Sequence, residues 1–149
     1  MAQTHFACVV IYRRMPSSGV ELLVVDYHSI DPRTGERTLK QVKFPGGTNR
    51  EYPDQAVEVT RDRETLEETG LIIQKSKEIW KFEANPEHIK FGFLVNIDDC
   101  RGYLRRVLFV DDGDELSPPR WVPAKTLGRS LFQTHQGVYL AACRELGIS

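Results

Sequence analysis

The chain has 149 residues, 40% of them hydrophobic and 28% charged, so it can bury one core and has the composition of an ordinary globular protein. Its formal net charge of -1 argues against a protein that follows long nucleic acids, because such proteins carry excess positive charge. The sequence lacks a signal peptide, a membrane-spanning apolar stretch (~20 residues) and any paired cysteine motif, so we expect a cytoplasmic protein.

Apolar runs and turn residues predict three strands in the first third of the chain. Residues 6–12 are rich in β-branched side chains, as in a buried strand, and a turn at 16–19 leads to a second strand at 21–27. After another turn, residues 39–44 alternate as in a third strand, which Pro45-Gly46-Gly47 is expected to end in a flexible turn.

The hydrophobic period then changes to that of an amphipathic helix over residues 53–69. Pro53 suits the first turn of this helix and Gly70 suits its end. The positions that recur at helical spacing are Ala56, Val59, Arg63, Leu66 and Gly70.

Further strands are predicted at residues 71–73, 78–84, 88–97 and 105–110, followed by a polar loop at 111–119. A closing amphipathic helix is predicted over 130–146, with Leu131, Val138, Ala141, Ala142 and Leu146 as candidate core residues. This order indicates an α/β (α+β) fold, a mixed sheet sandwiched between helices, in a single domain over residues 1–149.

Three glutamates in the first predicted helix are the strongest sign of chemistry. Glu64, Glu67 and Glu68 stand at i, i+3 and i+4, so their carboxylates converge on one face of the helix. Hard cations such as Mg²⁺ prefer this kind of ligand, and a neighbouring arginine, Arg63, can hold a carboxylate in place. A solvated acidic face is the alternative interpretation of the three glutamates alone.

The segment Arg63-Glu64-Thr65-Leu66-Glu67-Glu68-Thr69-Gly70-Leu71 resembles the core of the Nudix box, whose pattern is G-x5-E-x7-R-E-U-x-E-E-x-G-U, with U a bulky aliphatic residue. Three positions depart from the pattern. Gln55 stands where the upstream glutamate is expected, and Asn49 stands where the first glycine is expected, since Gly47 comes two residues too early. Thr65 replaces the first aliphatic residue, while the three glutamates are kept.

The resemblance implies a Nudix fold and a hydrolase that cleaves a nucleoside diphosphate linked to another moiety. Glu64, Glu67 and Glu68 would bind Mg²⁺ or Mn²⁺, the Gly47 carbonyl would be a further ligand, and Arg63 would orient the carboxylates. The metal would neutralise phosphate oxygens and activate a water molecule.

The general base and the substrate contacts stay open at this point. Glu67 or Glu68 would serve as the base from within the helix. Among loop acids Asp98 is preferred, because it follows the strand predicted at 88–97; the other loop acids considered are Asp99, Asp112 and Glu115. Arg13, at the end of the first strand, is a candidate contact for a substrate phosphate.

Two other functions compete with the hydrolase. A non-catalytic Nudix-fold module that binds a nucleotide or a partner is favoured by Gln55 and the displaced glycine, and disfavoured by the three retained glutamates. The other is a structural domain with an incidental acidic helix. The expected ligand is a small nucleotide-type diphosphate, with neither a membrane nor a long nucleic acid as partner, and the resemblance is compatible with a homodimer.

Overall fold

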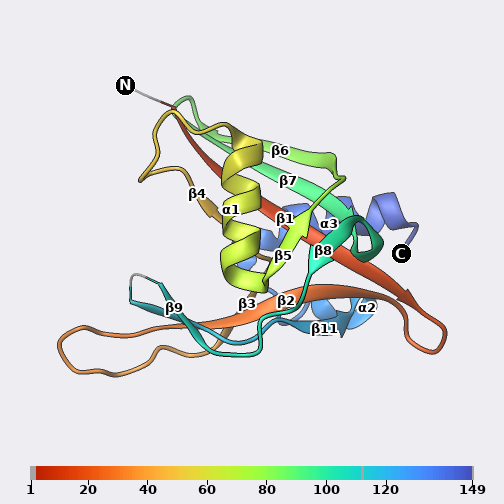
Figure 1. Cartoon of the computed structure of the whole chain (residues 1–149), viewed down its shortest axis with the longest axis horizontal. Coiled ribbons are helices and arrows are strands. Elements are labelled where there is room, and N and C mark those ends of the chain that lie inside the picture. Colours follow the sequence, from red (N-terminus) through yellow and green to blue (C-terminus); the bar gives the residue numbers. More distant parts are fainter. Residues whose placement is uncertain (1–2, 112, 149) are drawn as a thin grey trace.

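A computed structural model describes residues 3–111 and 113–148 of the chain (Figure 1). The helices are α1 (Val57–Thr69), α2 (Ala124–Leu127) and α3 (Gln136–Leu146), with two short 3-10 helices, η1 (Ile97–Asp99) and η2 (Gln133–His135). The strands are β1 (Thr4–Met15), β2 (Gly19–Ser29), β3 (Gln41–Lys43), β4 (Gly46–Thr48), β5 (Leu71–Ile73), β6 (Lys77–Asn85), β7 (His88–Asn96), β8 (Cys100–Gly102), β9 (Phe109–Asp111), β10 (Asp114–Leu116) and β11 (Arg120–Pro123).

Strand β1 is buried on both of its faces. Residues 7–11 are at most 1% exposed, and alternate side chains point into two separate apolar clusters. Cys8 and Val10 pack in the cluster that includes α2 and α3, whereas Val9 and Ile11 pack in the cluster that includes β5 and β7. Double burial explains why this stretch of the sequence is an uninterrupted apolar run instead of an alternating one.

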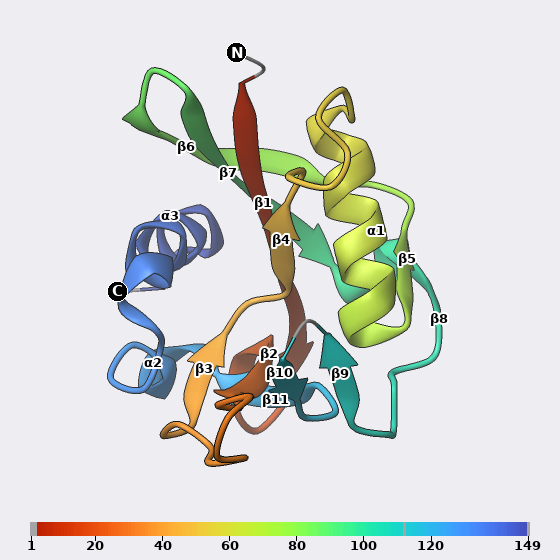
Figure 2. The ribbon, with the colours of Figure 1, turned by 90° about the vertical axis from the view of Figure 1, so that its left-hand side faces the viewer.

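The main sheet is mixed, because β1 runs parallel to β7 and antiparallel to β2 and β4. β1 pairs with β4 and β7 along its first part and with β2 only from Tyr12 to Met15. β2 pairs with β11 from Glu21 to Val24, where Glu21 and Leu22 lie between β1 and β11, and further along the chain it pairs with β3 and β10. The sheet therefore divides into two halves, and residues 44–45 cross from β3 in one half to β4 in the other (Figure 2).

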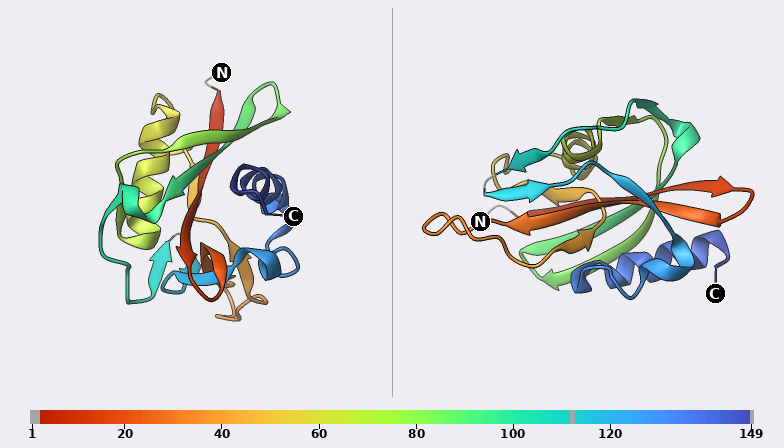
Figure 3. Two further views of the ribbon diagram at one scale, coloured as in Figure 1. Left: turned by 90° about the vertical axis from the view of Figure 1, so that its right-hand side faces the viewer. Right: turned by 90° about the horizontal axis from the view of Figure 1, so that it is seen from below.

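Helix α1 covers one side of the sheet, and α2 and α3 cover the opposite side (Figure 3). The small ribbon of β5 and β8 extends the α1 side. This three-layer arrangement confirms the predicted fold class, a mixed sheet between helices. Among the described residues, no helix combines the length and apolarity needed to cross a membrane.

Several predicted boundaries were wrong. Gly46 and Gly47 form strand β4 beside β1 instead of a flexible turn. Helix α1 begins at Val57, because residues 49–55 form successive turns, with Tyr52 N–H donating to Asn49 O and Gln55 N–H donating to Tyr52 O. The closing helix likewise begins only at Gln136, after η2.

Candidate active site

The inward face of α1 is polar, contrary to the stripe predicted from the sequence. Its apolar residues Val59 and Leu66 are 50% and 48% exposed. The buried side chains of this helix are Thr60, Arg61, Glu64, Thr65, Glu68 and Thr69. A helix that buries polar groups must satisfy them, and the hydroxyls of Thr65 and Thr69 do so by donating to carbonyls one turn back, each at 2.7 Å.

Two of the three glutamates lie against the paired glycines of β4. Glu64 is 9% exposed, and a Cβ atom added to Gly47 would lie only 2.3 Å from its carboxyl carbon. Glu68 is 4% exposed and accepts a hydrogen bond from Gly46 N at 3.4 Å. The absence of a side chain at Gly47 therefore creates the space that the Glu64 carboxylate occupies.

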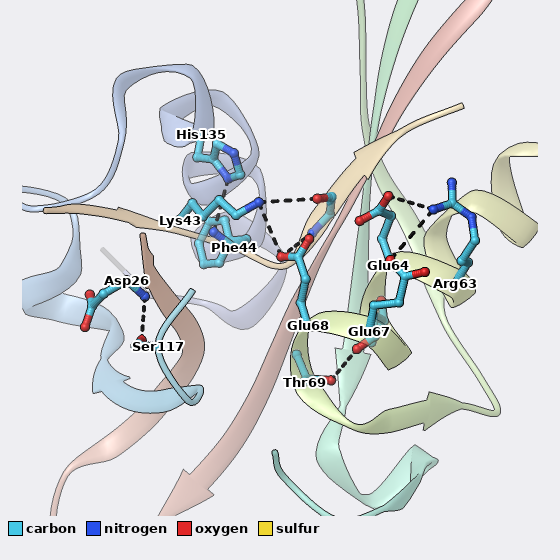
Figure 4. Close-up of polar contacts among 12 residues, drawn as sticks. Asp26, Lys43, Phe44, Arg63, Glu64, Glu67, Glu68, Thr69, Ser117 and His135 are labelled. Atoms are coloured by element: carbon cyan, nitrogen blue, oxygen red, sulfur yellow. Dashed lines mark hydrogen bonds and ion pairs between the residues drawn. The ribbon is translucent and has the colours of Figure 1, made fainter. Parts of the chain in front are cut away.

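The third glutamate occupies a more open position. The Glu67 side chain is 40% exposed, and its carboxylate lies 3.9 Å from Arg63 Nη1 (Figure 4). Within residues 3–111 and 113–148, no three Asp, Glu, His or Cys side chains already converge closely enough to hold a metal ion together. The cluster thus consists of two buried carboxylates and a third, Glu67, at its solvent side.

Arg63 is held by a network that includes Gln55. Its Nη1 donates to Glu64 Oε1 at 2.9 Å, and its Nε and Nη2 donate to Gln55 Oε1 at 3.3 and 3.2 Å. Gln55 Oε1 also accepts from Thr60 Oγ1 at 3.0 Å, and this hydroxyl lies 2.6 Å from His5 Nε2. The neutral amide oxygen of Gln55 thus holds the Arg63 guanidinium in position, and the guanidinium in turn holds the Glu64 carboxylate.

Lys43 contacts the cluster from β3. Its Nζ lies 3.3 Å from Glu68 Oε1, and its side chain is only 19% exposed. Burial alone would lower the pKa of Lys43, but the Glu68 carboxylate more than offsets this and holds the pKa above its usual value. Figure 4 shows Lys43 reaching Glu68 while Arg63 reaches Glu64, so each buried carboxylate has its own cation.

The Glu68 carboxyl group nevertheless resists ionisation. Burial raises the pKa of Glu68 to about 8, because desolvation and the adjacent Glu64 carboxylate outweigh the attraction of Lys43. Two carboxylates this close cannot both stay ionised easily without a further positive charge between them.

The cluster opens into a cavity of about 410 Å³, which is lined by residues of β3, β4, α1 and β10 and of the loop after β4. A second cavity, of about 280 Å³, shares Phe6, Lys43 and Asp114 with the first. Aromatic side chains, Phe6, Tyr27 and Phe132, contribute to the second cavity. A charged site and a more aromatic site therefore adjoin each other, with Lys43 at their boundary.

Comparison with solved structures decides the fold. The structure resembles MutT from Aliivibrio salmonicida and Vibrio cholerae (TM-score 0.64, 17% identity, covering 95% of this chain and 98% of the other). It also resembles the Nudix domain of Shewanella oneidensis NrtR in complex with ADP ribose (TM-score 0.69, 16% identity, 98% and 90% covered) and a MutT/Nudix family protein of Listeria innocua (TM-score 0.68, 15% identity, 99% and 96% covered). The chain has the Nudix fold. No protein-family model and no curated protein sequence matches it.

The departures from the Nudix box find a structural explanation. The buried Asn49 side chain accepts from His5 N at 2.8 Å and donates to Pro53 O at 3.3 Å, so it braces the loop between β4 and α1. Although Gly47 comes two residues earlier in the sequence than the box expects, it still lies against Glu64. The loop between β4 and α1 therefore accommodates the two extra residues. Thr65 is fully buried with its hydroxyl bonded to Arg61 O.

Two residues predicted for the site lie elsewhere in the Nudix fold. Asp98 is exposed in η1, where its backbone N–H donates to Asn96 Oδ1, and it lines neither cavity. Arg13 pairs with Glu21 at 2.7 Å and stacks over Trp121, also away from both cavities. Asp98 lies in η1, which follows the end of β7 that pairs with Tyr12. The glycines of β4 pair with β1 further toward its start, at Ala7 and Cys8, and the order of strands along the chain could not reveal this separation.

The other loop acids considered as general bases lie in different surroundings. Asp99 also lies in η1, and Glu115 is buried in an ion pair with Arg37 at 2.8 Å. Asp112 lies outside the described residues.

Sequence reasoning missed Lys43 and the role of Gln55. Strand alternation was the available signal for Lys43, since Val42 and Phe44 on either side of it are buried in the core and Lys43 must face the other way. For Gln55 the signal was its position, which is where the box expects the upstream acid.

Proposed function

We propose that this chain hydrolyses the phosphoanhydride bond of a nucleoside diphosphate linked to another moiety, with the help of Mg²⁺ or Mn²⁺. The observation that carries the proposal is the pair of buried carboxylates, Glu64 and Glu68, which lie against Gly46 and Gly47 in the wall of an open cavity. Burying two acids side by side is unfavourable for folding alone, and a function that needs a cation at this point accounts for it.

The donor set fits a hard divalent cation. Carboxylate and carbonyl oxygens are the ligands that Mg²⁺ prefers. Burial, followed by the adjacent Glu64 carboxylate, raises the pKa of Glu68, and a bound cation would favour the ionised form of this carboxyl group. Glu64, Glu68 and Glu67 would hold the ion, together with the Gly47 carbonyl. When bound, the ion supplies neutralisation of the phosphate oxygens and a lower pKa for a water molecule.

The side chains of the chain perform the remaining tasks. Arg63, itself positioned by Gln55, fixes the Glu64 carboxylate. Arg50 lines the cavity and places positive charge toward a substrate phosphate. Glu67, the most exposed of the three glutamates, is the proposed general base: it takes the proton of the water that attacks phosphorus, while the phosphate-bearing fragment leaves.

The form of the two cavities supports a nucleotide-type substrate. The acidic cavity suits the metal-bound diphosphate, and the neighbouring cavity with Phe6, Tyr27 and Phe132 suits a flat ring, which aromatic side chains contact well. The likeness to MutT and to a Nudix domain in complex with ADP ribose supports the same class. A cytoplasmic location and a homodimer stay predictions from the sequence.

The decisive experiment is a turnover assay. The protein is incubated with nucleoside triphosphates, ADP-ribose, other nucleotide sugars and dinucleoside polyphosphates, with Mg²⁺ or Mn²⁺, and phosphate-containing products are quantified. The same panel is run on Glu64→Gln, Glu67→Gln and Glu68→Gln, with Glu83→Gln on the exposed part of β6 as the matched control.

We expect turnover of at least one substrate class, a loss of about 100-fold or more in each of the three helix variants, and wild-type rates in the control, because metal-ligand and base residues commonly contribute factors of this order. Binding of a nucleotide without turnover across the panel would support the non-catalytic module instead.

A further inference from the structure

Lys43 is a partly buried cation at the boundary of the two cavities. It lies on the opposite side of β3 from the core residues Val42 and Phe44, with its side chain 19% exposed. Lysine is seldom buried to this degree without a partner, because its ammonium is strongly hydrated in water. The contacts of the Lys43 ammonium therefore indicate the function of this residue.

The Lys43 ammonium contacts oxygen atoms of the kind that bind divalent cations. Nζ lies 3.3 Å from Glu68 Oε1 and donates to Gly46 O at 3.4 Å, so it binds one carboxylate and one backbone carbonyl. Both are hard oxygen donors. A metal ion that uses Glu68 must share or take over these partners, and the ammonium must then find another anion or stay buried and unpaired, which is unfavourable.

The surroundings of Lys43 offer few alternative partners. Asp114 lines both cavities, but its carboxylate is hydrogen-bonded to Ser29 Oγ at 2.9 Å, and among the described residues the ion pair of Nζ is with Glu68. The ring of Tyr27 lies 5.6 Å from Nζ and gives only a cation–π contact. A phosphate oxygen of a substrate that spans the two cavities would pass directly beside Nζ, since Lys43 is part of both walls.

We propose that Lys43 is a substrate-binding residue that exchanges partners: its ammonium pairs with Glu68 in the empty site and with a substrate phosphate once a divalent cation has taken Glu68. This inference rests on the proposed function and adds to it a substrate-binding residue outside the acidic helix. The flexible four-carbon stem of lysine suits such an exchange better than the rigid fork of arginine does.

The test compares Lys43→Met and Lys43→Arg with wild type and with Lys75→Met, an exposed lysine after β5 whose replacement changes the net charge equally. Two probes are titrated by calorimetry: Mg²⁺ alone, and methylenediphosphonate, a diphosphate that cannot be hydrolysed, at saturating Mg²⁺. Circular dichroism verifies folding, and Lys43→Gln replaces Lys43→Met if the methionine variant fails to fold.

In Lys43→Met we expect Mg²⁺ affinity to be unchanged within about threefold or tighter, and diphosphonate affinity to fall about tenfold, the effect of losing one charge-assisted contact. Lys43→Arg should regain most of the diphosphonate affinity, because it restores the charge, and Lys75→Met should match wild type.

Three results would count against the inference, each in a distinguishable way. Mg²⁺ binding weakened more than about threefold in Lys43→Met would mean that the lysine supports the carboxylates instead of competing for them. Diphosphonate binding weakened less than about fivefold would mean that Nζ does not meet phosphate. Failure of the wild-type protein to bind Mg²⁺ at all would overturn the proposed function itself.

Discussion

Replacing each of the two adjacent glycines of β4 with alanine should separate the candidate site from the stability of the fold. At Gly47 the new methyl group would lie 2.3 Å from the Glu64 carboxyl carbon, and ordinary contact begins at 3.4 Å, so the carboxyl must retreat by about 1.1 Å. Neither glycine has a positive φ, so alanine fits the backbone at both positions.

The two substitutions meet different obstacles. The Glu64 side chain can rotate away from the methyl group added at position 47, but a misplacement of about 1 Å costs on the order of 100-fold in rate, or about 2.7 kcal/mol of transition-state stabilisation. At Gly46 the methyl group would lie 2.5 Å from Ala7 O and 2.7 Å from Cys8 Cα, which are backbone atoms of β1. Backbone cannot rotate aside, so Gly46→Ala should lower the free energy of unfolding by about 3 kcal/mol and the Tm by about 9 °C.

Thermal unfolding, Mg²⁺ titration and steady-state kinetics on the best substrate measure both effects. We expect Gly47→Ala to keep its Tm within about 3 °C of wild type while losing cation affinity and turnover. A Gly47→Ala protein with cation affinity and kcat/KM within about threefold of wild type would refute the reasoning, because it would show that Glu64 does not need its place against β4.

Three further predictions concern the supports of the site. Gln55→Ala removes the oxygen that accepts from Arg63 Nε and Nη2, so kcat/KM should fall about tenfold, and Gln55→Glu should restore it, since a carboxylate accepts the same bonds. Arg105→Lys should lower the free energy of unfolding by about 2 kcal/mol in urea, because the guanidinium of Arg105 donates to the carbonyls of Glu68, Val107, Leu116 and Ser117 and lysine cannot replace that fork. His135 accepts from Phe44 N, and burial lowers its pKa to about 3, below the 6.5 of the unfolded chain. As the pH falls, the unfolded state therefore binds a proton at His135 before the folded state does, which lowers the free energy of unfolding. Between about pH 7.5 and 5 we expect this free energy to fall by about 2 kcal/mol more in wild type than in His135→Gln.

Each of these has a clear contrary result. Equal kcat/KM for Gln55→Ala and wild type would show that Arg63 holds its position without the amide. An unchanged urea midpoint for Arg105→Lys would show that water satisfies the four carbonyls. Parallel pH profiles of stability for wild type and His135→Gln would show that His135 takes up its proton equally in both states.

The sequence predicted best those features that depend on short-range pattern. The apolar run of β1, which is buried on both faces, predicted a strand. Gly70 correctly predicted the end of α1, where it adopts a φ of 85°. Helix α1 itself was predicted, but hydrophobic periodicity alone would turn its apolar residues inward. Here the Glu64 and Glu68 carboxylates lie inside, and the apolar Val59 and Leu66 lie outside.

Features that depend on distant parts of the chain escaped prediction. The three-residue strands β8 and β10 depend on pairing with distant segments, β8 with β5 and β10 with β2 and β9, and their own sequences carry no periodic signal. Asp98 and Arg13 looked suitable by residue type, but only the parallel register of β1 with β7 reveals that they lie toward the other end of these strands from Gly47. The Glu64–Gly47 contact likewise joins residues that no local rule brings together.

The double burial of β1 has a consequence for how the protein opens. Amide protons in its middle, such as that of Val9, which donates to Pro45 O, should exchange with deuterium only when the whole molecule unfolds. The glycines that contact Glu64 and Glu68 are paired with this same strand, so the candidate site is attached to the part of the chain expected to exchange most slowly. Local breathing of the outer hairpins can then proceed without displacing the two buried carboxylates.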